Sequence, residues 1–585
     1  MTTPPAPALE PAPATAAKSR TGKSAPIPKS IAARVVAVLS TILALVLIVH
    51  TYRVFDQTCD EPSHLAAGVE WWVSHTYKLD PIDPPLAQIF IAAGPTLFLH
   101  AHSHCAEHPC DDHDVTPDGN TPDEGNAILR DGNYDRILTA ARLGILPFFL
   151  LTVALVWLRT RGWLGEAGAA LAVFLLCTCE PVLAHAGVAA TDVCFMATFF
   201  LALDRLWQFA IAPTLRNAIF AGLAAGLALV SKMTGLPYLL LSPMLLFAGL
   251  WLFRRRVPLL QQRPGSRLRW TPRLIGLPAA ALLACLLMLW ATYRFEVTAA
   301  IPSPKAAHIL EKAHVPERIA EHLFDHVPAG QYLIGLQLSY WMNAKPHPSY
   351  VLGQTNHHGK PYFFPVAILV KTPIPFLLFA LGGVLLAATR LRKRADPYPI
   401  LLFIGIATPL SFGIAAHVNL GLRHVLAIYP FLAMLAAMAI VWCWRLAIPY
   451  RVAVAALLLW QLAACIHASP DFLPYFNEAA AAHADFFLVD SDVDWGQDMK
   501  RVPPVLRQLH ADRISITRLG AADLNRVGLP PWQILPPNTP VTGWVVMSDA
   551  RLKLDAPAYD WIKPYKPVAM AGRSFFIYYI PPPQP

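Results

Sequence analysis

The chain has 585 residues, of which 55% are hydrophobic and 15% charged, and its mean hydropathy is +0.42. This composition excludes an ordinary soluble globular protein of this length. The net charge of +9 does not indicate a nucleic-acid partner. The basic clusters, among them 159–161, 253–273 and 389–394, alternate with apolar runs so that all fall on one side, which the positive-inside rule makes the cytoplasm.

Residues 1–30 are rich in Pro and Ala and lack periodicity, so we expect a disordered cytoplasmic tail. Apolar runs long enough to cross a bilayer then recur as far as residue 467. They predict a transmembrane domain over 31–467, with exterior loops at 53–135 and 294–362. The predicted spans, about eleven in number, are 35–52, 136–158, 164–185, 190–211, 215–232, 235–253, 273–293, 363–388, 398–416, 424–443 and 450–467.

The segment 468–585 differs in composition from the spans. It contains the runs "FFLVDSD", "RISITRLG", "GWVVMSDARL" and "SFFIYYI", which are typical of strands, and the partly helical run "WGQDMKRVPPVLRQLH". The Pro-rich stretch 529–540 is expected to be a loop. The predicted fold is therefore a mainly α polytopic membrane protein with a small C-terminal extracytoplasmic α/β domain.

Acidic residues gather where three loops leave the membrane on the predicted exterior side. Asp60 and Glu61 follow the first span, Asp83 lies in "YKLDPIDPPLAQIF", and Asp192 stands at the mouth of the fourth span. Solvated loop acids are the simpler interpretation of each residue alone. Carboxylates close to a bilayer are costly, however, and are kept where water, a partner or a task supports them.

The same face carries cations, namely Lys232, Lys371, Arg423 and His424. Either lysine alone could be snorkelling to the interface. Several cations opposite several acids suit an anionic head group held beside a general base. We expect the adjacent acids 60 and 61 to raise one pKa by like-charge repulsion.

Two clusters rich in His have more than one interpretation. The loop 100–114, "HAHSHCAEHPCDDHD", could bind zinc or hold a Cys105–Cys110 disulfide beside solvated histidines. In "SYVLGQTNHHGKPYFF", His358 is a candidate for an acceptor site, and a purely structural loop is the alternative.

An ordered series of motifs extends from residue 35 to about residue 505. It comprises the acids at 60–61, "DPPLAQ", "LVSKMTG", "YFFPVAILVKTPIP", "NLGLRHVLAIYPFL" and "VDSDVDWGQDMKRV". This series resembles bacterial relatives of the dolichyl-phosphate-mannose protein mannosyltransferases, which are phospholipid carrier-dependent enzymes of the GT-C glycosyltransferase superfamily. "SDVDWGQDMK" is the most specific of these motifs.

The resemblance implies a polyprenyl-phosphate-linked sugar as donor and transfer with inversion on the exterior face. Asp60 would accept the proton of the acceptor hydroxyl, and Glu61 would orient it or bind the acceptor. Lys232 and Arg423 would neutralise the donor phosphate, with Lys371 and His424 as further candidates. Related aminoarabinose transferases have a Glu-Lys pair before the Pro-Pro, where this chain has Ile82-Asp83, so Asp83 could contact the acceptor or a metal instead.

A transporter or flippase of lipid-linked or anionic solutes is the alternative function. Transporters tend to show internal repeats and midplane sites, whereas this sequence shows no convincing repeat and gathers its charges at one face. The bacterial resemblance indicates the cell membrane and a periplasmic C-terminal domain. The sugar, the acceptor (protein, lipid or glycan), a divalent metal requirement and the oligomeric state are not identified by the sequence.

Overall fold

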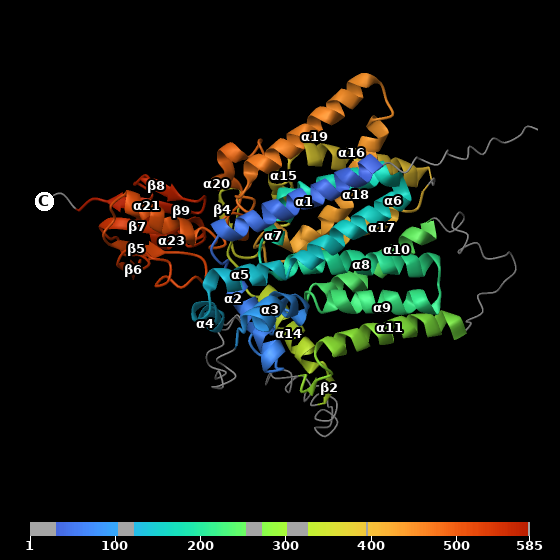
Figure 1. Ribbon diagram of the computed structural model, residues 1–585, viewed down its shortest axis with the longest axis horizontal. Coiled ribbons are helices and arrows are strands. Elements are labelled where there is room, and N and C mark those ends of the chain that lie inside the picture. The colour runs from blue at the N-terminus through green and yellow to red at the C-terminus, as the bar shows by residue number, and fades with distance from the viewer. Residues whose placement is uncertain (1–30, 103–121, 253–271, 301–325, 394–395, 583–585) are drawn as a thin grey trace, which may run out of the picture.

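The computed structural model describes residues 31–102, 122–252, 272–300, 326–393 and 396–582. A helical bundle fills most of the molecule, and a small sheet domain lies at one end of it (Figure 1). The predicted class, a mainly helical polytopic chain with a C-terminal α/β domain, is confirmed. The predicted tail 1–30 and most of the loop 100–114, including both of its cysteines, lie outside the described residues.

Within the described residues, seven helical segments are long and apolar enough to cross a membrane, by length and composition. They are Ile31–Val54, Tyr134–Cys177, Thr191–Ile211, Ile275–Thr292, Ile374–Arg392, Leu422–Cys443 and Ile448–Ala468. Four shorter apolar helices, Pro85–Leu99, Leu215–Leu229, Gly235–Trp251 and Pro399–Ala415, accompany them. The chain is therefore described below as an integral membrane protein.

In the first half of the bundle, several helices end or change direction near a Gly or Pro residue. Gly165 has φ 83° inside the long helix α6, a left-handed conformation that glycine adopts without strain, and it separates the two spans predicted on either side of it. The helices are α1 (Ile31–Val54), α2 (Glu61–Val73), α3 (Pro85–Leu99), α4 (Pro122–Asp131), α5 (Tyr134–Leu143), α6 (Leu146–Cys177), α7 (Glu180–Ala186), α8 (Thr191–Ile211), α9 (Leu215–Leu229), α10 (Gly235–Leu252) and α11 (Pro272–Thr292).

The second half begins with short strands and a helix that precede the next apolar helices. The span predicted over 363–388 is divided into α15 and α16 at Pro373, which is the N-cap of α16. Proline lacks the N–H that a continuous helix needs at this position. The elements are β1 (Val297–Thr298), β2 (Val327–Pro328), α14 (Gly330–Ala344), β3 (Ser349–Val351), β4 (Gln354–Asn356), α15 (Phe363–Lys371), α16 (Ile374–Arg392), α17 (Pro399–Ala415), the 3₁₀ helix η3 (Leu422–Ile428), α18 (Tyr429–Cys443) and α19 (Ile448–Ala468).

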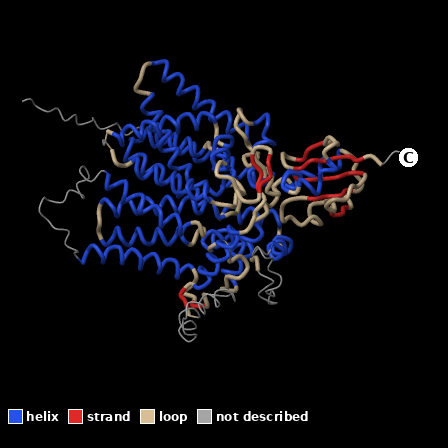
Figure 2. Tube along the Cα trace, turned by 180° about the vertical axis from the view of Figure 1, so that it is seen from behind, coloured by secondary structure: helices blue, strands red, loops and turns tan. Residues whose placement is uncertain are grey.

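The C-terminal domain has a mixed sheet in the order β6-β5-β7-β9-β8, visible at the end of the molecule in Figure 2. Strand β5 pairs in parallel with β6 and β7, and β9 runs antiparallel to β7 and β8. The elements are α20 (Ala484–Phe487), α21 (Val502–Gln508), β5 (Ile514–Thr517), β6 (Trp532–Ile534), β7 (Gly543–Ser548), α22 (Asp549–Leu554), α23 (Ala556–Tyr559), β8 (Ala569–Ala571) and β9 (Phe575–Ile580).

Alternate residues of the sheet pack into two cores, as period-two strands require. Ile514 and Val546 face one cluster, which includes Leu506 of α21, while Val545 and Met547 face the other. The strands predicted in "RISITRLG", "GWVVMSDARL" and "SFFIYYI" are confirmed as β5, β7 and β9. The loop predicted over 529–540 instead contains the three-residue edge strand β6.

"FFLVDSD" is not a strand, contrary to the prediction. It forms α20 and a 3₁₀ turn at Asp490–Asp492, and Asp490 has φ 61°, which is incompatible with a ladder. Hydrophobic side chains from Phe472 to Trp495 belong to the core of the membrane bundle, and the sheet domain's own core begins at Met499. The segment 490–498 therefore joins the two parts.

Two aspartates of this joining segment hold the sheet domain through its backbone. The Asp494 carboxylate accepts hydrogen bonds from the N–H of Ala550 (2.9 Å) and of Gly496 (3.2 Å). Asp498 accepts them from the N–H of Arg573 (2.9 Å) and the hydroxyl of Ser574 (3.0 Å). Charged residues of "SDVDWGQDMK" thus act as acceptors that fix one part of the chain on the other.

The Asp494 carboxyl gives a pH-dependent contribution to stability. Burial raises its pKa to about 7 against the effect of its hydrogen bonds, whereas an unfolded Asp titrates near ~3.9. The folded state therefore binds more protons between these values, and the contribution is complete below about pH 4 and is lost as the pH rises through about 7.

Replacing Asp494 with Asn keeps an acceptor oxygen and removes the titration. We expect the melting temperature of the wild type to fall relative to that of D494N by a few degrees between pH 4.5 and 7.5, measured by thermal unfolding in detergent. D512N, at an exposed position, is the control and should follow the wild type. Parallel pH profiles for wild type and D494N would contradict the assignment.

Candidate functional site

A cavity of about 930 Å³ lies among α2, the start of α3, the turn after α9, α14 and η3. Its charged and His residues come from four regions far apart in the sequence, and α14 supplies an apolar wall. The charged and His residues are Asp60, His64, Asp83, Lys232, His347, Arg423 and His424. The α14 residues include Leu333, Leu336, Tyr340 and Met342.

Asp60 and Arg423, which both line the cavity, form an ion pair with 2.6 Å between Oδ2 and Nη1. Asp60 stands at the N-cap of α2, and Arg423 is the second residue of the 3₁₀ helix η3. Burial acts to raise the pKa of Asp60, but the charges of Arg423 and His64 outweigh it and hold the pKa below its usual value. Asp60 is therefore ionised at neutral pH.

A second ion pair joins Lys232 to Asp192, with 2.5 Å between Nζ and Oδ1. Lys232 lies in the tight turn between α9 and α10, and Asp192 lies in the first turn of α8. The turn is tied to the "DPP" segment because the N–H of Leu86 donates to the carbonyl of Val230 (2.9 Å). The predicted convergence of acids and cations thus holds for these two pairs.

Glu61 points away from the cavity, contrary to the expectation that it orients Asp60 or binds the acceptor. Its carboxylate accepts from Arg142 Nε (2.7 Å) and Nη2 (2.8 Å) and from the N–H of Thr58 and Ala189. Burial acts to raise the pKa of Glu61, but Arg142 and these hydrogen bonds lower it overall. The predicted rise in one pKa of the adjacent pair is therefore wrong, because each carboxylate has its own guanidinium.

His64, Asp80 and Asp83 offer ligand atoms that all lie within 4.8 Å of one another. His64 Nδ1 is 3.1 Å from Asp80 Oδ2, and Asp80 Oδ1 has no hydrogen-bond partner within the described part of the chain. Burial and then Asp80 raise the pKa of Asp83 to about 6. Burial lowers the pKa of His64, but the three nearby acids outweigh it and raise it to about 9. These residues could hold a divalent cation in place of the imidazolium proton.

Lys371 and His358, like Glu61 and Asp192, do not line the cavity. Lys371 is buried, and its Nζ donates to the carbonyls of Leu473 (2.7 Å) and Asp492 (2.6 Å), so it holds the segment after α19 rather than a donor phosphate. His358 is exposed and forms an isolated bridge with His347. His347, which sequence reasoning did not single out, lines the cavity instead.

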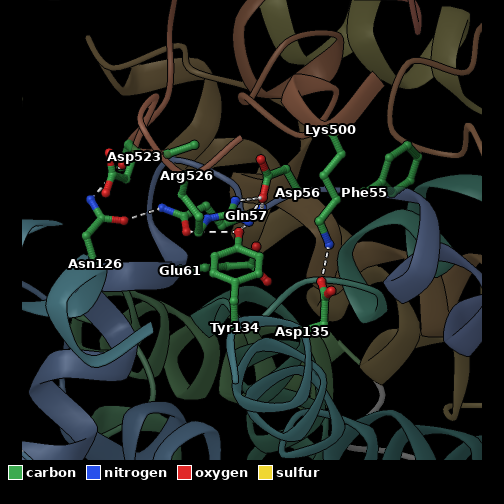
Figure 3. A network of polar contacts seen from close by, with 12 residues as sticks. Phe55, Asp56, Gln57, Glu61, Asn126, Tyr134, Asp135, Lys500, Asp523 and Arg526 are labelled. Atoms are coloured by element: carbon green, nitrogen blue, oxygen red, sulfur yellow. Dashed lines mark hydrogen bonds and ion pairs between the residues drawn. The ribbon is translucent and has the colours of Figure 1, made fainter. Parts of the chain in front are cut away.

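The loop that carries Asp60 is also fixed by the C-terminal domain (Figure 3). Arg526 donates to Asp56 (2.8 Å) and lies 3.3 Å from the centre of the Tyr134 ring, whose hydroxyl also donates to Asp56. Lys500 pairs with Asp135 at 2.5 Å. Residues of the loop, of α5 and of the sheet domain therefore meet in one polar network beside the cavity.

Arg142, His64 and the network residues were not predicted from sequence. Arg142 is a single cation within an apolar stretch, which is itself a signal, because such a residue requires a buried partner. His64 follows the Asp-Glu pair by one helical turn, and Asp60 and His64 therefore share a face of α2. No local pattern indicates Arg526 or Tyr134.

No protein-family model and no curated protein matches the chain. Solved structures similar to it include ArnT from Cupriavidus metallidurans bound to undecaprenyl phosphate, with 14% identity, TM-score 0.46, and coverage of 95% of this chain and all of ArnT. Another is the oligosaccharyltransferase AglB from Archaeoglobus fulgidus with an inhibitory peptide and dolichol-phosphate, with 13% identity, TM-score 0.41, and coverage of 89% of this chain and 70% of AglB.

The Glu61–Arg142 pair is expected to support the fold of the site. Both side chains are 1% exposed, so R142M leaves a buried carboxylate without its cation, at a cost of about 3–5 kcal/mol. We expect a clear fall in melting temperature for R142M and a smaller fall for the double variant E61Q/R142M, measured by thermal unfolding in detergent. R136M, at an exposed position of the same helix, is the control. Equal losses in the single and double variants would argue against the pair.

The cluster of His64, Asp80 and Asp83 predicts divalent-cation binding that competes with protons. After EDTA treatment, we expect the purified chain to rebind one Mn²⁺ or Zn²⁺ more tightly at pH 8 than at pH 6, and the D80N/D83N variant to lose it. Elemental analysis and calorimetry give the stoichiometry. The C105S/C110S variant is the control for the His- and Cys-rich loop. Loss of the cation in that variant alone would show that the loop binds it instead. If wild type binds no cation, His64 and the two aspartates form only an ion pair with a protonated imidazole.

Proposed function

We propose that the chain is a membrane glycosyltransferase that transfers a sugar, of the hexosyl or mannosyl type, from a polyprenyl-phosphate-linked donor to an acceptor hydroxyl. The observation that carries the proposal is a cavity in which an ionised carboxylate, Asp60, lies beside two cations, Arg423 and Lys232. A phosphoryl leaving group needs cations, and an attacking hydroxyl needs a base. This cavity offers both, next to an apolar wall that suits a lipid.

The proposed reaction is a single displacement at the anomeric carbon of the donor sugar. The acceptor oxygen attacks the anomeric carbon from the face opposite the phosphate, and the bond between that carbon and the phosphate oxygen breaks with its electron pair on the phosphate. Because the attack comes from the face opposite the leaving group, the configuration inverts, and the acceptor proton passes to the Asp60 carboxylate. Base assistance of this kind contributes about 10²–10⁴-fold, and cations aimed at a leaving group whose charge grows contribute a comparable electrostatic effect.

The donor phosphate would reach cations that are already paired. When it approaches Arg423, it competes with Asp60 for the guanidinium, and a carboxylate that loses a cationic neighbour becomes more basic. Asp60 would therefore act as a base mainly when the donor is bound. Asp192 would keep Lys232 in place, and His424, half-buried at the cavity wall with a buried Nε2 that has no hydrogen-bond partner within the described chain, is a further group for the phosphate or the sugar.

The proposed setting is a bacterial cell membrane with the cavity and the C-terminal domain on the exterior face. A lipid-linked donor brings its own phosphate to the interface, so only the acceptor has to diffuse to the site. Asp83, at the cavity wall, is assigned to the acceptor or to a cation. The acceptor itself is proposed only as a hydroxyl of a protein, a lipid or a glycan.

Asp60→Asn tests the proposed function. Purified wild type and D60N are incubated with a panel of radiolabelled polyprenyl-phosphate sugars and a membrane extract, and label in the acceptor fraction is counted. We expect wild type to transfer from one donor and D60N to be slower by about 10²–10⁴-fold. D512N, at an exposed position of the C-terminal domain, should transfer at the wild-type rate.

The same assay separates the enzyme from a transporter. D60N with wild-type transfer would remove Asp60 as the base. Absence of transfer by wild type, together with movement of a labelled lipid-linked sugar across vesicles that contain it, would replace the glycosyltransferase with a flippase.

A further inference from the structure

Trp495 packs directly against the cation of the proposed site. Its indole lies 4.3 Å, from ring centre to Cζ, beneath the guanidinium of Arg423. The side chain is 2% exposed, which makes it one of the most deeply buried large side chains of the chain. Trp495 comes from "SDVDWGQDMK", which begins at residue 491, whereas the last membrane helix ends at Ala468. No residue of this motif lines the cavity.

The backbone of the same segment holds the other member of the ion pair. The N–H of Cys59, next to Asp60, donates to the carbonyl of Trp495 (2.9 Å), and the N–H of Asp56 donates to the carbonyl of Gln497 (2.8 Å). Residues 495–497 therefore contact Arg423 through a ring and the Asp60 loop through two carbonyls. One short segment sets the relative position of the proposed base and the proposed phosphate ligand.

The segment is itself fixed. The Gln497 side chain accepts from the N–H of Trp495 (2.8 Å) and donates to the carbonyl of Val493 (2.9 Å). Gly496 has φ +86°, and a Cβ there would lie 2.9 Å from the Cα of Gly520 in the sheet domain. The turn after Trp495 is thus closed on one side by its own glutamine and on the other by the C-terminal domain.

Arg423 depends on such a support because it has few other contacts. Its Nη1 binds Asp60, and its Nε has no hydrogen-bond partner within the described chain. A guanidinium stacks well on an aromatic face, and the interaction is stronger where water is excluded. If Asp60 is released during the reaction, the ring is the contact that keeps the cation in place.

We propose that Trp495 is a positioning residue for transfer, which holds the Arg423 guanidinium where the leaving phosphate of the donor gains its charge. This inference rests on the proposed function. The donor phosphate carries one negative charge as a diester and gains a second when its bond to the sugar breaks. A misplaced guanidinium therefore costs more in the transition state than in the bound donor, and the loss falls on kcat rather than on KM.

The test compares two substitutions at this position in the full-length protein in detergent. W495M fills much of the volume without a π face, and W495F keeps an aromatic face. We expect W495M to lower kcat by about 10–100-fold, roughly tenfold less than the ~10²–10³-fold that removal of a transition-state donor costs, with donor KM changed by less than about threefold. W495F should recover most of kcat. W544M, at a partly buried tryptophan of strand β7 away from the cavity, is the matched control and should match wild type.

Each outcome bears on the proposal. A wild-type kcat in W495M, equal losses in W495F and W495M, or a loss confined to KM would overturn it. If thermal unfolding shows that W495M is not folded, the kcat of W495F is compared with that of the control W544F. Values equal to wild type in both variants support the proposal that an aromatic face is enough to hold the Arg423 guanidinium. If wild type transfers sugar from no donor, the proposed function fails. The link between Trp495 and Arg423 is then tested separately by measuring the binding of a polyprenyl phosphate without sugar. Binding that is weakened equally in W495M and W495F would contradict that link.

Discussion

The pairing of buried charges is the constraint on which the rest of this structure depends. An ionised group taken out of water carries a desolvation penalty of several kcal/mol, and a partner at hydrogen-bond distance offsets it. The Asp60–Arg423, Asp192–Lys232 and Glu61–Arg142 pairs all obey this rule, with distances of 2.5–2.7 Å. Each pair joins helices that are distant in sequence, so satisfying the charges also assembles the cavity.

The pairs divide into two kinds by what surrounds them. Glu61 has all of its hydrogen bonds filled by Arg142 and two backbone N–H groups, and nothing can approach it. Asp60 and Lys232 border the cavity, where a ligand could exchange with one partner. Adjacent acids in one sequence motif thus take different tasks, since a helix start turns consecutive side chains in different directions.

Sequence patterns predicted the features that depend on local chemistry. The apolar runs predicted the helices, and the β-branched and aromatic runs predicted β5, β7 and β9. The position of charged residues near the ends of the spans predicted that Asp60, Asp192, Lys232 and Arg423 lie close together. Patterns failed where a distant contact decides the outcome. "FFLVDSD" has strand composition, but its neighbours are membrane helices rather than a sheet edge. Lys371 resembles an interfacial cation, yet the carbonyls that bind it lie about a hundred residues further along the chain.

The same charge balance explains how a site full of closed ion pairs could work. A donor phosphate adds an anion to a cavity whose cations are already matched, so one carboxylate must lose its charge or its partner. In the proposed reaction, accepting a proton from the acceptor hydroxyl would neutralise Asp60 at the moment when the leaving phosphate gains its second charge. Negative charge would then move from the carboxylate to the phosphate, while Arg423, which lies on the Trp495 ring, would keep one anionic partner throughout. In this arrangement proton transfer and phosphate departure favour each other, because each removes the electrostatic cost of the other.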